Sequence, residues 1–285
     1  MKVGFFDKRV RRKSLGYISA VFTFFSFVLT FTDFSALWRY VLLGLAIFLS
    51  LCIYFVVWCK ANRYSKKNIT INGNNIILNK SNIFDSKYNG DIKIIPCNEF
   101  FDTGDMINEK SINGQYLKKM LNDKVYSNIG GIDRAISESL ANIKKGHVEV
   151  ERLSGGKKER YDLGTICFLR DGYCLLAFTK FDENNRAILS HKDYISSLLN
   201  MWENLDITYN GKNIVIPLLG GGITRFLDSN NGTTMSNQEL LKYLLYSLKL
   251  SGKTFKSNIT IIVAHNNEEL EKVNLFEIGE ISRDI

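Results

Sequence analysis

Two long uncharged apolar runs near the amino terminus constrain this chain more than any other feature. Residues 15–32 and 40–59 form runs of 18 and 20 residues without a charged side chain. At about 1.5 Å of helical rise per residue, each run can cross most or all of a hydrocarbon core of roughly 30 Å. A signal peptide is the competing interpretation of the first run, because a basic region precedes it. The length of that run and the second run close behind it favour a transmembrane helical hairpin.

The formal net charge of +8 is concentrated in the same region. Residues 1–67 hold 11 Lys and Arg against 2 Asp, whereas the rest of the chain holds 26 basic and 27 acidic side chains. The tail before the first run and the segment 60–67 after the second run are strongly basic, whereas the loop between the runs is nearly neutral. The positive-inside rule therefore predicts that both ends of the hairpin face the cytoplasm. The neutral remainder argues against non-specific nucleic-acid binding. We therefore predict a basic cytoplasmic tail at 1–14, a transmembrane hairpin at 15–67 and a cytoplasmic domain at 68–285.

The pattern of residues 68–285 predicts strands that alternate with helices. Asn72-Gly73 and Asp171-Gly172 indicate tight hairpin turns, and Ser236 with Glu239 forms a capping box that opens a helix. Strands are expected at 69–71, 75–78, 91–97, 147–153, 158–163, 165–170, 173–179, 214–217 and 258–264. Helices are expected at about 114–125, from 132 to near 146, and at 190–205 and 236–252. This order predicts a mixed sheet between layers of helices, an α/β/α fold.

Cysteine and histidine usage gives no sign of a metal centre. The chain has five Cys and three His, without a CxxC pair and without ligand spacing among the histidines. Free thiols in a reducing compartment are expected, and structural zinc is not.

A glycine triplet is the first candidate binding feature. The short apolar strand 214–217 opens into Leu219 and the triplet Gly220, Gly221 and Gly222. Glycine lets a ligand approach the main-chain amides, and a loop past the carboxyl end of a strand can present those amides to phosphate. An ordinary flexible surface loop is the alternative interpretation, because a glycine triplet alone is a weak motif.

A polar segment after the strand 91–97 is the second candidate. It is expected to open on the same rim of the sheet as the glycine triplet, which would create a nucleotide-binding crevice. Asn98 would bond ribose hydroxyls there. Phe100 or Phe101 would stack on a ring, with the other of the two in the core.

Signatures of enzymes are sparse. The chain has no GxSxG, HExxH or GxxxxGK[ST] motif. Gly155-Gly156-Lys157 resembles the end of a phosphate loop but sits in a predicted hairpin, so we interpret it as a turn. Ser190-His191 is interpreted as a helix cap. The segment 182–186 is either a solvated loop or part of the site.

Six segments taken in order resemble one bacterial family of macro domains. They are 83–84 (IF), 95–103 (IPCNEFFDT), 113–115 (NGQ), 163–165 (LGT), 181–186 (FDENNR) and 216–225 (IPLLGGGITR). The likeness covers nearly all of 69–285. In that family two transmembrane helices precede the macro domain, and the chain resembles the membrane effectors of type II Thoeris anti-phage defence.

The resemblance implies a function as well as a fold. A macro-like domain would bind an ADP-ribose derivative, such as histidine-ADP-ribose, that a TIR-domain partner makes from NAD. Binding would drive homo-oligomerisation. The effector, in contact with membrane lipid, would then disrupt the bacterial inner membrane. The resemblance implies no cofactor besides this ligand, and no metal.

The resemblance also assigns roles to residues. Gly220, Gly221, Gly222, Ile223 and Thr224 match the diphosphate loop of the family. Asn98 matches the asparagine that faces the distal ribose, and Asp102 and Thr103 lie beside it. Leu219, Arg225, Glu99 and Phe101 are further expected ligand-binding residues. Asn82 and Ile83 would lie at the adenine end. The family often has a Gly-Asp pair before the Ile-Phe, and here Ser81 and Asn82 occupy those positions. Asp85 is therefore the candidate for adenine recognition.

Two other functions stay open. A membrane-tethered ADP-ribosyl hydrolase would need Asp102 or Glu99 as its base. A channel or transporter subunit is disfavoured, because neither run contains an ionisable group.

Overall fold

The structure of the chain is a computed structural model that describes residues 3–141, 143, 147–152, 155–222, 224–227 and 235–284. Contacts between residues divide the chain into two compact units. The helical unit comprises Met1–Ser65 and Asn274–Asp284, and the sheet unit comprises Lys66–Val273. The sequence-based division placed all of 68–285 in one domain, so the two divisions differ in the assignment of the last helix.

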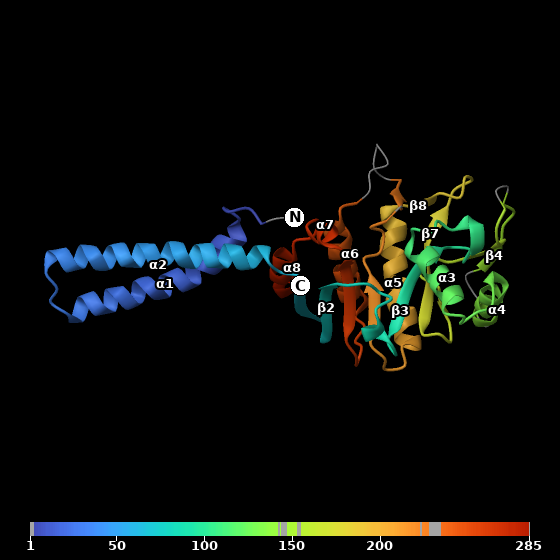
Figure 1. The fold of residues 1–285 in the computed structure, drawn as a ribbon, viewed down its shortest axis with the longest axis horizontal. Helices are drawn as coiled ribbons and strands as arrows, with labels where there is room; N and C mark the ends of the chain where they lie inside the picture. The colour runs from blue at the N-terminus through green and yellow to red at the C-terminus, as the bar shows by residue number, and fades with distance from the viewer. Residues whose placement is uncertain are drawn as a thin grey trace. The chain divides into compact units, whose positions relative to one another are not determined.

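The helical unit is built on two long helices, α1 (Lys8–Phe31) and α2 (Ala36–Asn62), which lie side by side and antiparallel (Figure 1). Both are long and apolar enough to cross a membrane, and they contain the two predicted runs except Thr32. The predicted tail is helical from Lys8 onward, because the Asp7 carboxylate accepts a hydrogen bond from the Arg9 amide at 2.8 Å and caps α1.

The last helix, α8 (Leu275–Asp284), belongs to the helical unit. The Phe276 ring stacks on Tyr64 with 6.3 Å between centroids, and the Lys13 ammonium lies 5.3 Å from the centre of the same ring. Arg9 Nη2 lies 3.1 Å from the Glu277 carboxylate. This helix was not predicted from the sequence, because its partners lie at the opposite end of the chain.

The sheet unit contains a nine-stranded mixed sheet among the described residues, in the order β1-β2-β11-β9-β3-β7-β8-β10, with β6 beside β7. The strands are β1 (Lys66–Ile71), β2 (Asn74–Lys80), β3 (Ile92–Asn98), β6 (Ile166–Phe168), β7 (Tyr173–Phe181), β8 (Ala187–Leu189), β9 (Ile214–Pro217), β10 (Arg225–Phe226) and β11 (Ile259–Ala264). The run from β2 to β7 is parallel. Strand β1 pairs antiparallel with β2, and β6 and β8 pair antiparallel with β7, whereas β10 pairs parallel with β8. A separate ladder joins β4 (His147–Glu149) to β5 (Glu159–Tyr161).

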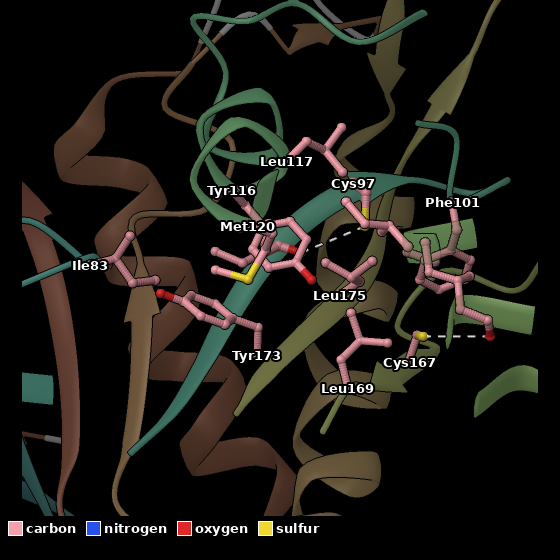
Figure 2. Packing of buried hydrophobic residues seen from close by; sticks show 14 of the residues in the cluster. Ile83, Cys97, Phe101, Tyr116, Leu117, Met120, Cys167, Leu169, Tyr173 and Leu175 are labelled. Carbon is pink, nitrogen blue, oxygen red and sulfur yellow. Dashed lines mark hydrogen bonds between the residues drawn. The ribbon is translucent and has the colours of Figure 1, made fainter. Parts of the chain in front are cut away.

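Helices cover both faces of the sheet. Tyr173 and Leu175 of β7 pack in one core cluster with α3 (Ile112–Asn122) and α4 (Ile129–Leu140), as Figure 2 shows in part. Phe178, which points to the opposite face because side chains alternate along a strand, contacts Tyr194 of α5 (His191–Thr208) at 5.6 Å between ring centroids. Helix α6 (Asn237–Ser251) packs on α5, and the short α7 (Asn267–Leu270) follows β11. The predicted three-layer α/β/α fold with a mixed sheet is confirmed.

Local signals in the sequence were accurate guides to these elements. The Asn72-Gly73 turn joins β1 to β2 with positive φ at both residues, and the capping box at Ser236 and Glu239 opens α6. Gly252 ends α6 in the left-handed conformation, with φ of 64°. The strands β8 and β10 were not predicted, because elements of two or three residues carry no periodicity.

Candidate functional site

A crevice of about 820 Å³ opens at the edge of the sheet where the parallel strands end. Residues that end or follow β2, β3, β7, β9 and β11 line it, including Asn82, Asn98, Phe181, Leu218 and His265. Small-molecule sites in proteins have volumes of roughly 300–1,000 Å³. The crevice thus has the size and position at which α/β folds bind ligands.

The glycine triplet lines the crevice and divides into two roles. Gly220 is structural: its φ is +84°, and a Cβ there would lie 3.2 Å from Leu240 and 3.3 Å from Tyr194. Gly221 and Gly222 are exposed to the crevice, and a Cβ on Gly222 would meet no atom within 4 Å. Among the residues that the structure describes, no protein group accepts a hydrogen bond from the three glycine amides. These amides are donors available to an anion.

Asn98 ends β3 at the other half of the crevice, and its polar atoms already bond to the protein. Its Oδ1 accepts from the amides of Phe100 at 2.9 Å and Asp102 at 3.2 Å, and its Nδ2 donates to Asp102 Oδ2 at 3.0 Å. The side chain lines the crevice but is only 2% exposed. In this structure Asn98 therefore shapes the turn after β3.

A buried ion pair lies behind this turn. Arg152 Nη1 donates to Asp102 Oδ2 at 2.8 Å, Nη2 donates to Asn185 Oδ1 at 2.7 Å, and the guanidinium lies 4.1 Å from the centre of the Phe100 ring. The Lys157 amide donates to Asp102 Oδ1 at 2.9 Å. The side chains of Arg152 and Asp102 are 7% and 1% exposed. Asp102 does not line the crevice, and its two oxygens each accept at least two hydrogen bonds.

Gly156 makes this ion pair possible. Its φ is +97°, and a Cβ there would lie 2.3 Å from Arg152 Nη1 and 2.9 Å from Asp102 Oδ1. The segment Gly155-Gly156-Lys157 lies between β4 and β5, as the interpretation as a turn requires. Part of that predicted hairpin, Leu153 and Ser154, lies outside the described residues.

Several predicted site residues lie away from the crevice. The side chains of Ile83 and Phe101 are 0% and 1% exposed and belong to the core cluster in Figure 2, and Leu219 is fully buried. The Thr103 hydroxyl donates to a carboxylate of α4 at 2.7 Å. Ile223 lies outside the described residues, whereas Thr224 and Arg225 line the crevice.

The predicted adenine end is organised by Asp85. The Ser81 hydroxyl donates to Asp85 Oδ2 at 2.9 Å, and this bond is the main reason that the pKa of Asp85 is lowered. Asn82 lines the crevice, while its Oδ1 accepts from the Phe84 amide at 2.9 Å. Asp85 does not line the crevice, so adenine recognition by Asp85 stays a prediction.

The crevice is also lined by residues that were not predicted there, and by Arg186, for which the sequence left two interpretations open. Asn113 on α3 is 4% exposed, and its Oδ1 has no hydrogen-bond partner among the described residues. Lys110, Arg186 and Lys272 add cationic side chains to the lining. Two of these residues, Asn113 and Arg186, lie in the segments 113–115 and 181–186 that carry the family resemblance, and those segments could have indicated them.

No acidic or thiol cluster suited to a metal ion occurs within the part of the chain that the structure describes. Glu99, the other candidate base, is 6% exposed, and burial raises its pKa against the opposing effect of Arg160 and Lys180. It does not line the crevice.

Taken together, the fold and the crevice define a macro-type ligand-binding domain that follows two candidate membrane helices. The comparisons with known proteins agree. A family model described as "Thoeris protein ThsA, Macro domain" matches residues 76–264. The chain is also similar to Thoeris protein ThsA of Bacillus amyloliquefaciens (strain Y2), with 32% identity over 283 residues, covering 98% of this chain and 91% of that protein.

The chain therefore belongs to the Thoeris ThsA macro-domain family. The resemblance that the sequence motifs indicated is confirmed. Membership supports a role in anti-phage defence, with a signalling nucleotide as the ligand of the macro domain.

Proposed function

We propose that the chain is a sensor and effector whose crevice binds an ADP-ribose derivative and whose helical unit acts on the membrane. The observation that carries the proposal is that Gly220, Gly221 and Gly222 line the crevice and that their amides have no protein acceptor among the described residues. A diphosphate needs donors of this kind, at a place that a side chain would block.

The distribution of polar groups supports an elongated nucleotide. The glycine loop lies on β9, in the centre of the sheet, with the Asn82 end towards β2 and the Asn98 end towards β7. A diphosphate at the centre would place a nucleoside on one side and a second ribose on the other. Arg186 and Arg225 extend the lining beyond the Asn98 end, and Lys272 belongs to the segment after β11.

The covalent connection between the units supports a coupled response. The chain passes between the units after Ser65 and again after Val273. Lys272 lines the crevice, and two residues later Asn274 caps α8 by accepting from the Glu277 amide at 3.0 Å. A ligand that orders the segment around Lys272 acts on the chain that leads directly into α8, and thereby on the helical unit. It can shift the assembly only by its differential affinity for the two states.

The remaining parts of the proposal concern location and partners. The protein would lie in the bacterial inner membrane with both termini in the cytoplasm, and a TIR-domain partner would make the ligand from NAD. Cysteine labelling in spheroplasts tests the location. The mass of the nucleotide that co-purifies with the chain from infected cells tests the ligand.

The central experiment measures binding and assembly with the full chain in detergent. Calorimetry with ADP-ribose and histidine-ADP-ribose is expected to give saturable binding, and mass photometry is expected to show larger assemblies with the preferred ligand. Absence of heat with every ADP-ribose derivative contradicts the sensor. Tight binding without a change in assembly contradicts the effector step alone.

The hydrolase alternative is supported by one observation, the raised pKa of Glu99, which suits a general acid or base. Two observations favour the sensor instead: Asp102 is engaged by Arg152, and neither carboxylate lines the crevice. Chromatography of the ligand after incubation separates the functions. Recovery of intact ligand is expected, and its conversion would support the hydrolase.

A further inference from the structure

The first described residues of the chain fold back onto α2. The Val3 amide donates to Asn62 Oδ1 at 2.8 Å, and Trp58 Nε1 donates to the Val3 carbonyl at 2.9 Å. The Tyr54 hydroxyl donates to the Phe5 carbonyl. The Phe5 ring meets Tyr54 and Trp58 edge-on, with 5.1 and 5.4 Å between centroids. The segment before α1 is thus an ordered part of the helical unit.

This segment, the first turns of α1 and the last turns of α2 line an open groove of about 880 Å³. Its lining is apolar except for one cation: Phe5, Phe6, Arg11, Leu51, Cys52, Tyr54, Phe55 and Val56. Phe6 and Leu51 are 79% and 65% exposed. A groove of this composition suits a ligand with a long apolar part and an anionic head.

The charges around the groove favour an anion. Arg9 pairs with Asp7 at 3.7 Å and with Glu277 at 3.1 Å. Among the residues that the structure describes, Arg11 and Arg12 form no ion pair. Arg11 therefore places in the groove a positive charge that has no ion-pair partner among the described residues.

The depth of the groove matches a membrane lipid. Arg11 precedes Leu15, the first residue of the apolar run, by four residues, or about 6 Å of helix outside the hydrocarbon. Leu51 precedes Cys59, the end of the second run, by eight residues, or about 12 Å inside it. The groove spans the boundary at which a phospholipid has its phosphate on one side and its acyl chains on the other.

We propose that the groove binds one anionic glycerophospholipid, with its phosphate at Arg11 and an acyl chain along Leu51 and Phe55. The site rests on the membrane insertion of the proposed function. A charge-assisted bond from the guanidinium selects the anionic head, and the aromatic rings of Phe5 and Phe6 cover the chain. The helical unit then recognises a lipid at a defined place, beyond general attraction to an anionic surface.

The test uses the full chain purified in detergent, with native mass spectrometry after addition of phosphatidylglycerol or phosphatidylcholine. Arg11→Gln is compared with Arg12→Gln, which makes the same charge change on the next residue of α1 but lies outside the groove lining. Wild type and Arg12→Gln are expected to retain one phosphatidylglycerol in preference to phosphatidylcholine. Arg11→Gln is expected to bind phosphatidylglycerol about tenfold more weakly, the loss expected for a hydrogen bond to a charged group.

Four results would overturn the site. Equal losses in the two variants would mean general electrostatic attraction, and equal retention of both lipids would mean an unselective lipid-facing surface. Release of the chain from membranes by alkaline carbonate would remove the insertion and, with it, the membrane part of the proposed function. Retention in carbonate, combined with an Arg11→Gln variant that binds like wild type, overturns the lipid site alone.

Discussion

The two halves of the crevice contrast in how far the protein satisfies its own polar groups. The side-chain oxygen of Asn98 and both carboxylate oxygens of Asp102 accept hydrogen bonds from within the chain. In the glycine triplet that follows β9, the amides lack acceptors among the described residues, and the oxygen of Asn113, which lines the same crevice from α3, also lacks a partner there. Both sets of residues lie at the same rim of the sheet. Only the glycine amides and the Asn113 oxygen are hydrogen-bonding groups without a protein partner among the described residues.

This difference has an energetic consequence. A ligand group that bonds to a satisfied atom displaces an existing bond and gains little. The exposed amides of Gly221 and Gly222 have no protein bond to displace, and a bond to the buried Asn113 oxygen removes a desolvation cost of about 1–3 kcal/mol. We therefore expect the Gly221 half to carry most of the affinity, and the Asn98 half to hold the shape of the crevice.

Asp102→Asn is expected to have the largest effect, on stability. It leaves the buried Arg152 guanidinium without a counter-charge, and breaking a buried pair in this way costs about 3 kcal/mol or more. Asp133→Asn is the matched control, because its pair with Lys157 at 2.7 Å is about one-third exposed on both sides and is worth less than about 1 kcal/mol. Thermal unfolding of the two variants in detergent measures the difference. Equal losses would contradict the description of the Asn98 half as a scaffold.

Gly221→Val is expected to have the largest effect on ligand affinity. A branched side chain at the mouth of the loop keeps phosphate oxygens away from the amides, and loss of two charge-assisted bonds corresponds to about 100-fold weaker binding. Gly222→Val serves as the folding control, since its Cβ meets no protein atom within 4 Å. Calorimetry on both variants, with melting curves alongside, checks the prediction. Binding at wild-type affinity would remove the loop from the site.

Asn113→Leu is expected to have opposite effects on stability and binding. Removing an unsatisfied buried oxygen leaves the free protein as stable or more stable, while a ligand that donates to that oxygen binds up to about tenfold more weakly. Gln115→Leu is the matched control on the same helix, because Gln115 Nε2 already donates to the Lys110 carbonyl at 3.1 Å. A larger affinity loss in Gln115→Leu than in Asn113→Leu would reverse the assignment of the two residues.

The sequence predicted the elements of the sheet unit because their signals are local. The Asn72-Gly73 turn, the Asp171-Gly172 turn and the capping box at Ser236 each act within a few residues, and each occurs where it was expected. The three-layer arrangement then followed from the alternation of strands and helices.

The features that were not predicted depend on contacts between distant residues. Arg152, between β4 and β5, pairs with Asp102, which follows β3 fifty residues earlier. Phe276 packs on Tyr64 from the opposite end of the chain. The motif around Asn98 indicated that the side chain would reach the rim, but its hydrogen bonds to Phe100 and Asp102 depend on the turn that those residues form. Sequence reasoning therefore located the crevice without distinguishing its two halves.

Glu99→Gln is expected to have the smallest effect, visible in the pH dependence of stability. Burial raises the pKa of Glu99 above its unfolded value near 4.5, so the folded chain holds the proton more tightly than the unfolded chain. The stability contributed by this group is complete below that value and is lost as pH rises through the raised pKa. Gln stays neutral, so the stability of Glu99→Gln relative to wild type is expected to increase as the pH rises above about 4.5.

Melting curves of the two proteins across this range measure the trend, and a difference that stays constant with pH would mean that Glu99 is solvated in the folded chain. The same variant also bears on the hydrolase alternative. A base that acts on the ligand would make turnover depend on Glu99, whereas a buried scaffold carboxylate changes the melting curve and leaves ligand affinity as in wild type. The Asn98 half is a scaffold only if Glu99→Gln changes the pH dependence of melting and leaves ligand turnover and ligand affinity as in wild type.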